Sequence, residues 1–174
     1  MLYIESALEG LDRQQLTVDE LNEATVLTRK KIIARSQLAQ AQQLVIEEAQ
    51  ASIAMVKRAI TSYVDSSFDA AHVANVHVAL NTVRGGLQIL NYPRAAAVVK
   101  SCSAFLSSHI SQQMGGEQRQ QLLEILADAL ISLEYYLVEL ENSRDVNDDI
   151  LRVAEDSLDA LGYKVAPVSD SQDL

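Results

Sequence analysis

Apolar residues recur at intervals of three and four along most of the chain, which is the spacing of one face of an α-helix. The clearest run lies within residues 117–142, where leucines follow an a/d pattern over nearly three heptads. These are Leu123, Leu126, Leu130, Leu133, Leu137 and Leu140. A second face runs from about 36 to 64 and consists of Leu38, Ala41, Val45, Ala49, Ser52, Val56, Ile60 and Tyr63. The alternation expected of strands is missing, so the pattern predicts an all-α protein.

Breaks in this pattern divide the second part of the chain into further helices at about 70–90, 93–113, 117–142 and 146–161. Asp69 is a good N-cap for the first of them, and Asn91 suits the left-handed conformation that ends it before Pro93. The last helix is expected to turn Val146, Ile150, Val153, Ser157 and Leu161 inward. Because the connections are short, neighbouring helices should run antiparallel. Residues 36–163 are therefore predicted to form an antiparallel up-and-down helical bundle.

The two ends of the chain have weaker patterns. A short helix at 2–11 should stop near Gly10, and Thr17-Val18-Asp19-Glu20 has the form of a capping box that starts another helix at about 18–33. Residues 1–35 are therefore expected to be an N-terminal helical arm made of additional helices. Residues 164–174 are expected to be a disordered tail, and 142–145 a turn.

Charge and composition exclude several functional classes. The net charge is −10, and residues 117–174 contain fourteen acidic and four basic side chains, so a nucleic-acid partner is disfavoured. No apolar run has the ~18–20 residues of a membrane span. Cys102 is the only cysteine, which is typical of a cytoplasmic protein and suggests an inert core thiol. The N-terminus lacks the features of a signal peptide, and we expect the chain to be a piece of a larger protein.

Residues 81–91, Asn-Thr-Val-Arg-Gly-Gly-Leu-Gln-Ile-Leu-Asn, carry the most informative motif. They resemble the signature of a histidine phosphotransfer (HPt) domain, in which a helix carries His-Thr-hydrophobic-Lys-Gly. Asn81 stands where the resemblance places the phosphoryl-accepting histidine, and a carboxamide has no basic lone pair with which to attack phosphorus. Arg84 retains the cation of the motif. The resemblance therefore implies an HPt-like bundle that is not an enzyme.

The outer face of the 70–90 helix is the predicted partner-binding face. It consists of His77, Asn81, Arg84, Gly85 and Gln88. A glycine inside a helix costs ~1 kcal/mol relative to alanine, so the pair Gly85-Gly86 indicates that something approaches this helix closely. Either a neighbouring helix or a partner protein fits that requirement, and the sequence leaves both open.

Other chemistry at this helix is weakly supported. His77 lies one turn before Asn81 on the same face, but it lacks the lysine and glycine that should follow an acceptor. Thr82 has no general base in the sequence around it. His72 and His109 lack partners at metal-ligand spacing, so neither a metal nor a cofactor is predicted.

A more specific resemblance rests on several segments that together cover nearly the whole chain. They are residues 2–8, 45–49, 83–90, 126–137 and 150–162. The chain resembles an N-terminal repeat of the chemotaxis-type histidine kinases of type IV pilus systems (the ChpA/PilL type), which is related to a repeat in the pilus scaffold protein FimL. This resemblance implies a protein-interaction module of two-component signalling in twitching motility. It also implies a cytoplasmic protein, recruited to the cell pole, that binds response-regulator receiver domains or pilus and polar scaffold proteins.

Two alternatives remain at this level. The domain could be purely architectural, a spacer or a homodimer formed through the leucine seam or the N-terminal arm; an exposed apolar stripe within residues 2–27 would favour this. Less favoured is a phosphotransfer domain with an unusual acceptor, His77 or Thr82.

Overall fold

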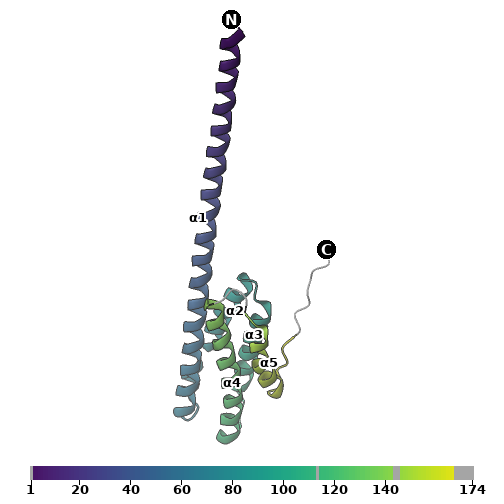
Figure 1. Ribbon diagram of the computed structural model, residues 1–174. Helices are drawn as coiled ribbons and strands as arrows, with labels where there is room; N and C mark the ends of the chain where they lie inside the picture. The colour runs from purple at the N-terminus through teal and green to yellow at the C-terminus, as the bar shows by residue number, and fades with distance from the viewer. Residues whose placement is uncertain (1, 113, 143–145, 167–174) are drawn as a thin grey trace. The chain divides into compact units, whose positions relative to one another are not determined.

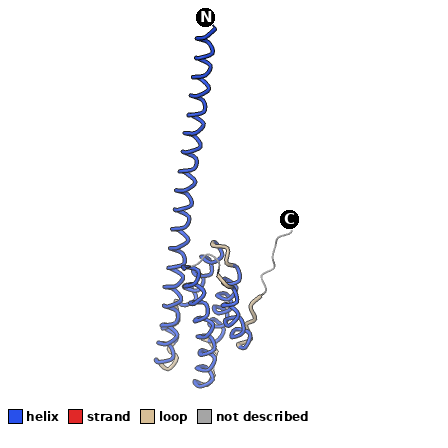
Figure 2. Tube along the Cα trace, viewed as in Figure 1, coloured by secondary structure: helices blue, strands red, loops and turns tan. Residues whose placement is uncertain are grey.

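The computed structural model is helical, and no strand occurs among the residues that it describes (Figure 2). It describes the backbone of residues 2–112, 114–142 and 146–166, and side chains within these ranges from Thr17 onward except Asp19. The elements are α1 Leu2–Asp65, η1 Ala70–Val73, α2 Val76–Ile89, α3 Pro93–His109, α4 Gly116–Asn142, η2 Asp148–Ile150 and α5 Leu151–Ala160, and Figure 1 labels the α-helices. The predicted all-α class is confirmed.

The chain divides into two units, residues 1–41 and 42–174, and each is described by itself. In the second unit, side-chain contacts fix how the helices run. Gln50 contacts the backbone of Leu137, and Tyr63 contacts Arg119, so the last part of α1 runs antiparallel to α4. Contacts between α2 and α3 and between α4 and α5 join each pair across a short connection.

The core of this unit contains the whole predicted leucine seam of α4, because all six of its leucines are buried. The matching stripe on α1 follows a heptad spacing and consists of Ile46, Ala49, Ile53, Val56, Ile60 and Tyr63. Three predicted members of the α1 face differ: Leu38 and Ala41 are exposed, and Val45 is only half-buried. Leu38 lies outside the second unit, where no bundle core is available to cover it.

The last helix is rotated by about one residue from its predicted face. Val153, expected inward, is 57% exposed, whereas Leu151, Ala154 and Leu158 are buried. Residues 148–150 form a 3₁₀ turn, with the side chain of Asn147 accepting a hydrogen bond from the Asp149 amide. A 3₁₀ turn has 3.0 residues rather than 3.6, so the helical register that follows is shifted.

Other boundaries also differ from the prediction. The helix expected at 70–90 consists of η1 followed by α2, and α3 ends at His109 rather than near 113. Asp69 does cap the chain at this point, accepting a hydrogen bond from the Ala71 amide at 3.0 Å. Asn91 has φ of 63°, the left-handed conformation predicted for it. Residues 143–145 of the predicted turn and 167–174 of the predicted tail lie outside the described residues.

The first unit contradicts the predicted break near Gly10 and the helix start at Thr17. A single helix runs without interruption through both positions. The cost of one helical glycine is ~1 kcal/mol, which the surrounding helix-forming residues offset. Threonine hydroxyls can form hydrogen bonds with backbone carbonyls inside a helix. Thr25 and Thr28 each donate such a bond to the carbonyl four residues earlier. A capping-box sequence is therefore compatible with a helix interior, as it is here.

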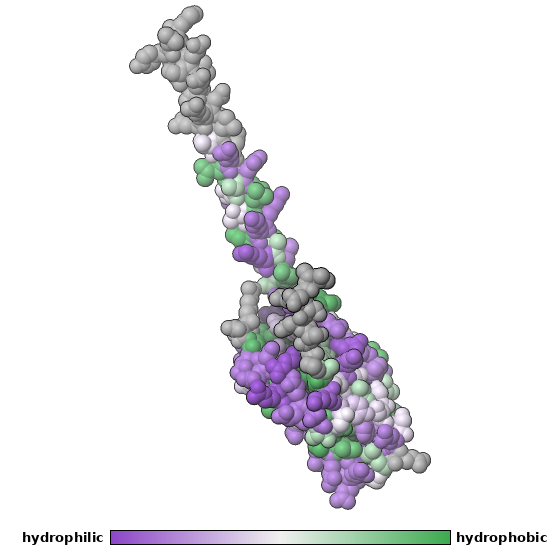
Figure 3. Space-filling view, turned by 90° about the vertical axis from the view of Figure 1, so that its right-hand side faces the viewer, coloured by the Kyte–Doolittle hydropathy of each residue, from purple (hydrophilic) through white to green (hydrophobic). Residues whose placement is uncertain are grey.

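Described side chains from Thr17 to Leu38 in this unit are exposed. They include several large apolar residues, namely Val18, Leu21, Val26, Leu27, Ile32, Ile33 and Leu38. On the face shown in Figure 3, apolar residues are interspersed with hydrophilic ones along the described part of this unit.

Candidate partner-binding face

Helix α2 carries all five residues predicted for the partner-binding face. Its buried side packs Leu80, Val83 and Leu87 into the core. His77, Asn81, Arg84 and Gln88 follow at steps of four, three and four, and therefore share a different side of the helix. Gly85 lies beside this row of residues, on the part of the helix surface that is turned towards solvent.

His77 is the centre of a polar network that links α2 to α3. The Asn81 side-chain amide nitrogen lies 2.8 Å from His77 Nε2, and His77 Nδ1 lies 2.8 Å from Ser103 Oγ. An amide N–H only donates, so Nε2 accepts this bond and Nδ1 carries the proton that it donates to Ser103. Ser107 Oγ lies 3.5 Å from the same Nδ1. In this arrangement both ring nitrogens of His77 are engaged.

Neither Ser103 nor Ser107 was predicted from the sequence to belong to this face. Their spacing of four on α3 places them on one side of that helix, but only the packing of α3 on α2 shows what that side faces. The Thr82 hydroxyl donates to the Val78 carbonyl at 3.1 Å, so it is also engaged within α2.

The remaining predicted residues have contrasting environments. Gln88 is exposed, and Arg84 is half-buried. The Arg84 Nε is buried, with no hydrogen-bond partner among the described residues. A buried donor without a partner costs roughly 1–3 kcal/mol. Arg84 therefore retains an incompletely satisfied cation on this face of α2.

The two glycines of the motif have different roles. A Cβ on Gly86 would lie 2.8 Å from Val45 Cγ1, so Gly86 allows α1 and α2 to pack closely. A Cβ on Gly85 would meet nothing within 4 Å. Close packing of α1 on α2 explains Gly86. No contact among the described residues explains Gly85. The alternative that a partner protein approaches the helix therefore stays open for Gly85 only.

A groove of about 450 Å³ lies beside Gly85, between α1 and α2. We call it the α1–α2 groove. Its lining includes Leu44, Val45 and Glu48 of α1 and Asn81, Gly85 and Ile89 of α2. Leu44 is 65% exposed and Ile89 is 82% exposed, so its two rims present large apolar side chains to solvent.

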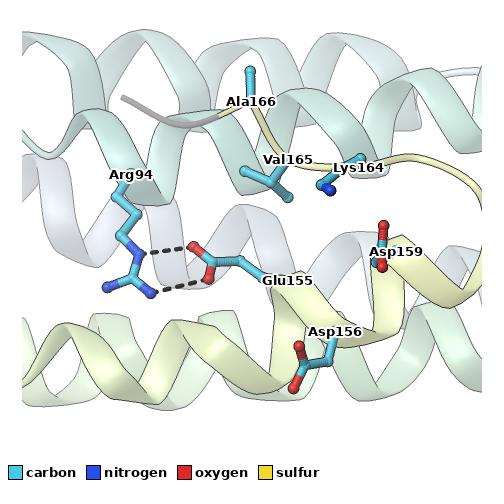
Figure 4. Close-up of a pocket in the computed structure, with 7 residues that line it drawn as sticks. All are labelled: Arg94, Glu155, Asp156, Asp159, Lys164, Val165 and Ala166. Atoms are coloured by element: carbon cyan, nitrogen blue, oxygen red, sulfur yellow. Dashed lines mark hydrogen bonds and ion pairs between the residues drawn. The ribbon is translucent and has the colours of Figure 1, made fainter. Parts of the chain in front are cut away.

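A second hollow of about 450 Å³ lies between α3, α5 and residues 164–166 and contains none of the predicted site residues (Figure 4). Arg94 and Glu155 form a bidentate ion pair there, with N–O distances of 2.7 and 2.9 Å. The hydrogen bond to Glu155 is the main reason that the pKa of Arg94 is raised above its ordinary value. This pair connects α3 to α5.

Neither a metal cluster nor a membrane-spanning helix occurs among the described residues. No group of three or more His, Cys, Asp or Glu side chains there is placed to hold a metal ion. Within the same part of the chain, no helix has the length and apolar character needed to cross a membrane.

Comparison with known proteins gives two matches. The family model of the FimL C-terminal domain matches residues 36–158. The chain is 41% identical over 169 residues to the scaffold protein FimL of Pseudomonas aeruginosa, an alignment that covers 95% of this chain and 30% of the relative. The chain belongs to the FimL C-terminal domain family. No solved structure matches it.

Membership of the FimL C-terminal domain family confirms the resemblance to the pilus scaffold protein. The matched range contains α2 to α4 and all five predicted face residues. Relation to the kinase repeat and HPt-like character stay predictions. The chain spans about 30% of the length of its FimL relative.

Proposed function

We propose that this domain is a non-catalytic, HPt-like protein-interaction module that binds receiver domains through the outer side of α2, in the signalling that controls type IV pili. Membership of a scaffold protein's domain family supports the interaction role. The kinase resemblance and the motif at 81–91 support the choice of partner. The same proposal includes recruitment of the protein to the cell pole.

The observation that carries the proposal is the environment of His77 and Asn81. A carboxamide stands at the position expected for the acceptor, and its amide hydrogen-bonds the nearest imidazole nitrogen at 2.8 Å. Attack on phosphorus requires an available nucleophilic lone pair; the carboxamide of Asn81 has no basic one, and the Nε2 lone pair of His77 accepts the bond from Asn81. The unusual-acceptor alternative is thereby disfavoured, while the surface around these residues remains accessible to a partner.

Arg84 is the proposed electrostatic contact with a receiver. Receiver phosphorylation pockets are acidic, so a cation beside them favours the correct docking orientation. An exposed ion pair contributes only ~0.2–1 kcal/mol, so most of the affinity must come from apolar contact nearby. The apolar rims of the α1–α2 groove are adjacent on the same helix.

Calorimetric titration of the domain with receiver domains of the pilus chemosensory pathway, with and without a phosphoryl mimic, tests this function. We expect at least one receiver to bind and Arg84→Glu to weaken that binding by about tenfold or more, because the reversed charge repels the acidic pocket. Arg152→Glu, the same charge reversal at an exposed position on α5, should leave the affinity unchanged. Absence of heat with every receiver would contradict the proposal.

A second candidate function, architectural self-association, is favoured by the apolar side chains exposed on residues 18–38. Val18, Leu21 and Ile32 occupy a and d positions of one heptad frame along α1, with Thr25 and Thr28 at the two positions between Leu21 and Ile32. The leucine seam of α4 cannot serve this purpose while it is buried in its own bundle. Sedimentation velocity distinguishes the candidates, because self-association through the arm would be lost in the double variant Leu21→Glu and Ile32→Glu.

A further inference from the structure

The side of α2 that faces away from the core is more apolar than a solvent-facing helix requires. Val78, Thr82, Gly85 and Ile89 follow at steps of four, three and four, so they form one ridge. Val78 is 65% exposed and Ile89 is the most exposed large apolar residue described in the chain. Leu44 continues this surface across the α1–α2 groove. Contiguous exposed apolar side chains of this kind mark interaction sites.

Gly85 adds a second and independent observation. A glycine inside a helix lowers helix stability by ~1 kcal/mol relative to alanine, and the space above Gly85 is empty to at least 4 Å. Unlike Gly86, it is not needed for packing inside the described domain. Because Gly85 has no side chain, the backbone of a bound partner can approach α2 closely at this point of the groove.

The shape and charge of the groove restrict its occupant. It lies between two helices, where the side-chain ridge of a third helix can pack, and the described residues offer no sheet edge for an extended strand. Glu48 is the one charged side chain among the residues that line it. A basic residue on the incoming helix would complement Glu48.

We propose that the α1–α2 groove binds an amphipathic helix of a partner protein, with apolar residues against Leu44 and Ile89 and a lysine or arginine beside Glu48. This inference rests on the proposed function, since it names the partner element that contacts the same helix. It adds a groove on α1 and α2 that the sequence motif did not indicate.

The test uses fluorescence anisotropy of a labelled helical peptide of about 18 residues, roughly five turns. The peptide has leucines at i, i+3, i+4 and i+7 spacing and lysines flanking them. One control peptide has the same residues in an order that breaks the apolar face, and another has glutamate in place of lysine. The full chain should bind the first peptide at least about tenfold more tightly than either control.

Matched variants locate the binding. Ile89→Asp should weaken binding of the lysine peptide at least about tenfold, and Glu48→Lys should reverse the preference between the lysine and glutamate peptides. Ile131→Asp is the control, because Ile131 is also exposed but lies on α4 outside the groove. All three positions are at the surface, and thermal unfolding verifies that each variant folds.

Equal binding of the scrambled peptide, or full binding by Ile89→Asp, would overturn the inference. Self-association of the chain that Ile89→Asp abolishes would also overturn it, by assigning the groove to a second copy. Receiver binding that depends on Arg84, combined with peptides that are not discriminated, would remove this inference and leave the proposed function intact. If the chain discriminates between the peptides but binds no receiver, the groove inference stands and the proposed function fails.

Discussion

Replacing Leu133 with alanine is expected to lower the free energy of unfolding by about 3–5 kcal/mol, measured by urea denaturation. Leu133 is completely buried in the middle of the α4 seam. The substitution removes its transfer free energy and leaves a cavity among closely packed neighbours, which are already in contact and can collapse only in part. A domain of this size is stable by only about 5–15 kcal/mol, so the loss would be a large fraction of the total.

Ile131→Ala is the matched control on the same helix. Ile131 is 52% exposed, and its replacement should change the free energy of unfolding by no more than about 0.5 kcal/mol. If the leucine seam instead joined two chains, the urea midpoint of the parent chain itself would rise with protein concentration. That dependence would contradict the closed bundle and revive dimerisation through α4.

Cys102 is expected to resist alkylation in the native protein. Its side chain is fully buried on α3, and burial raises the pKa of the thiol from 9.0 to about 12. The thiolate is the reactive species, so the raised pKa lowers its fraction at pH 8, and burial also keeps the reagent away from the sulfur. Iodoacetamide labelling followed by mass spectrometry should therefore be about a thousandfold or more slower in buffer than in denaturant, with opening of the fold setting the native rate.

The raised pKa of Cys102 also predicts how pH affects the stability of the fold. Because the folded pKa lies above the unfolded value, the contribution of the neutral buried thiol is complete below pH 9 and is lost as pH rises from about 9 towards 12. Cys102→Ala should remove that part of the alkaline loss. Native labelling at the rate seen in denaturant would show that α3 is not packed as described.

Much of the helical bundle could be predicted from periodicity, because burial in α4 follows a regular spacing of leucines. Predictions failed where local geometry overrides the pattern. The 3₁₀ turn before α5 rotates the helix and exposes Val153. Neither Gly10 nor the capping-box sequence at Thr17 ends or starts a helix, because both residue types also fit a helix interior.

The candidate face was only partly accessible to sequence reasoning. The motif places His77, Asn81, Arg84, Gly85 and Gln88 on α2, as the structure has them. Ser103 and the groove residue Leu44 belong to other helices, and only the packing of α3 and α1 on α2 brings them near. The distinction between the two glycines likewise depends on the position of Val45.

A nuclear magnetic resonance footprint tests most directly whether partners bind at α2. Isotope-labelled full chain would be titrated with an unlabelled receiver domain while its backbone amide resonances are followed. We expect shifts and broadening to concentrate in α2 and in residues 42–65 of α1, with the amides of α5 unchanged. Perturbations confined to residues 1–41 or to α5, with α2 unaffected, would contradict it.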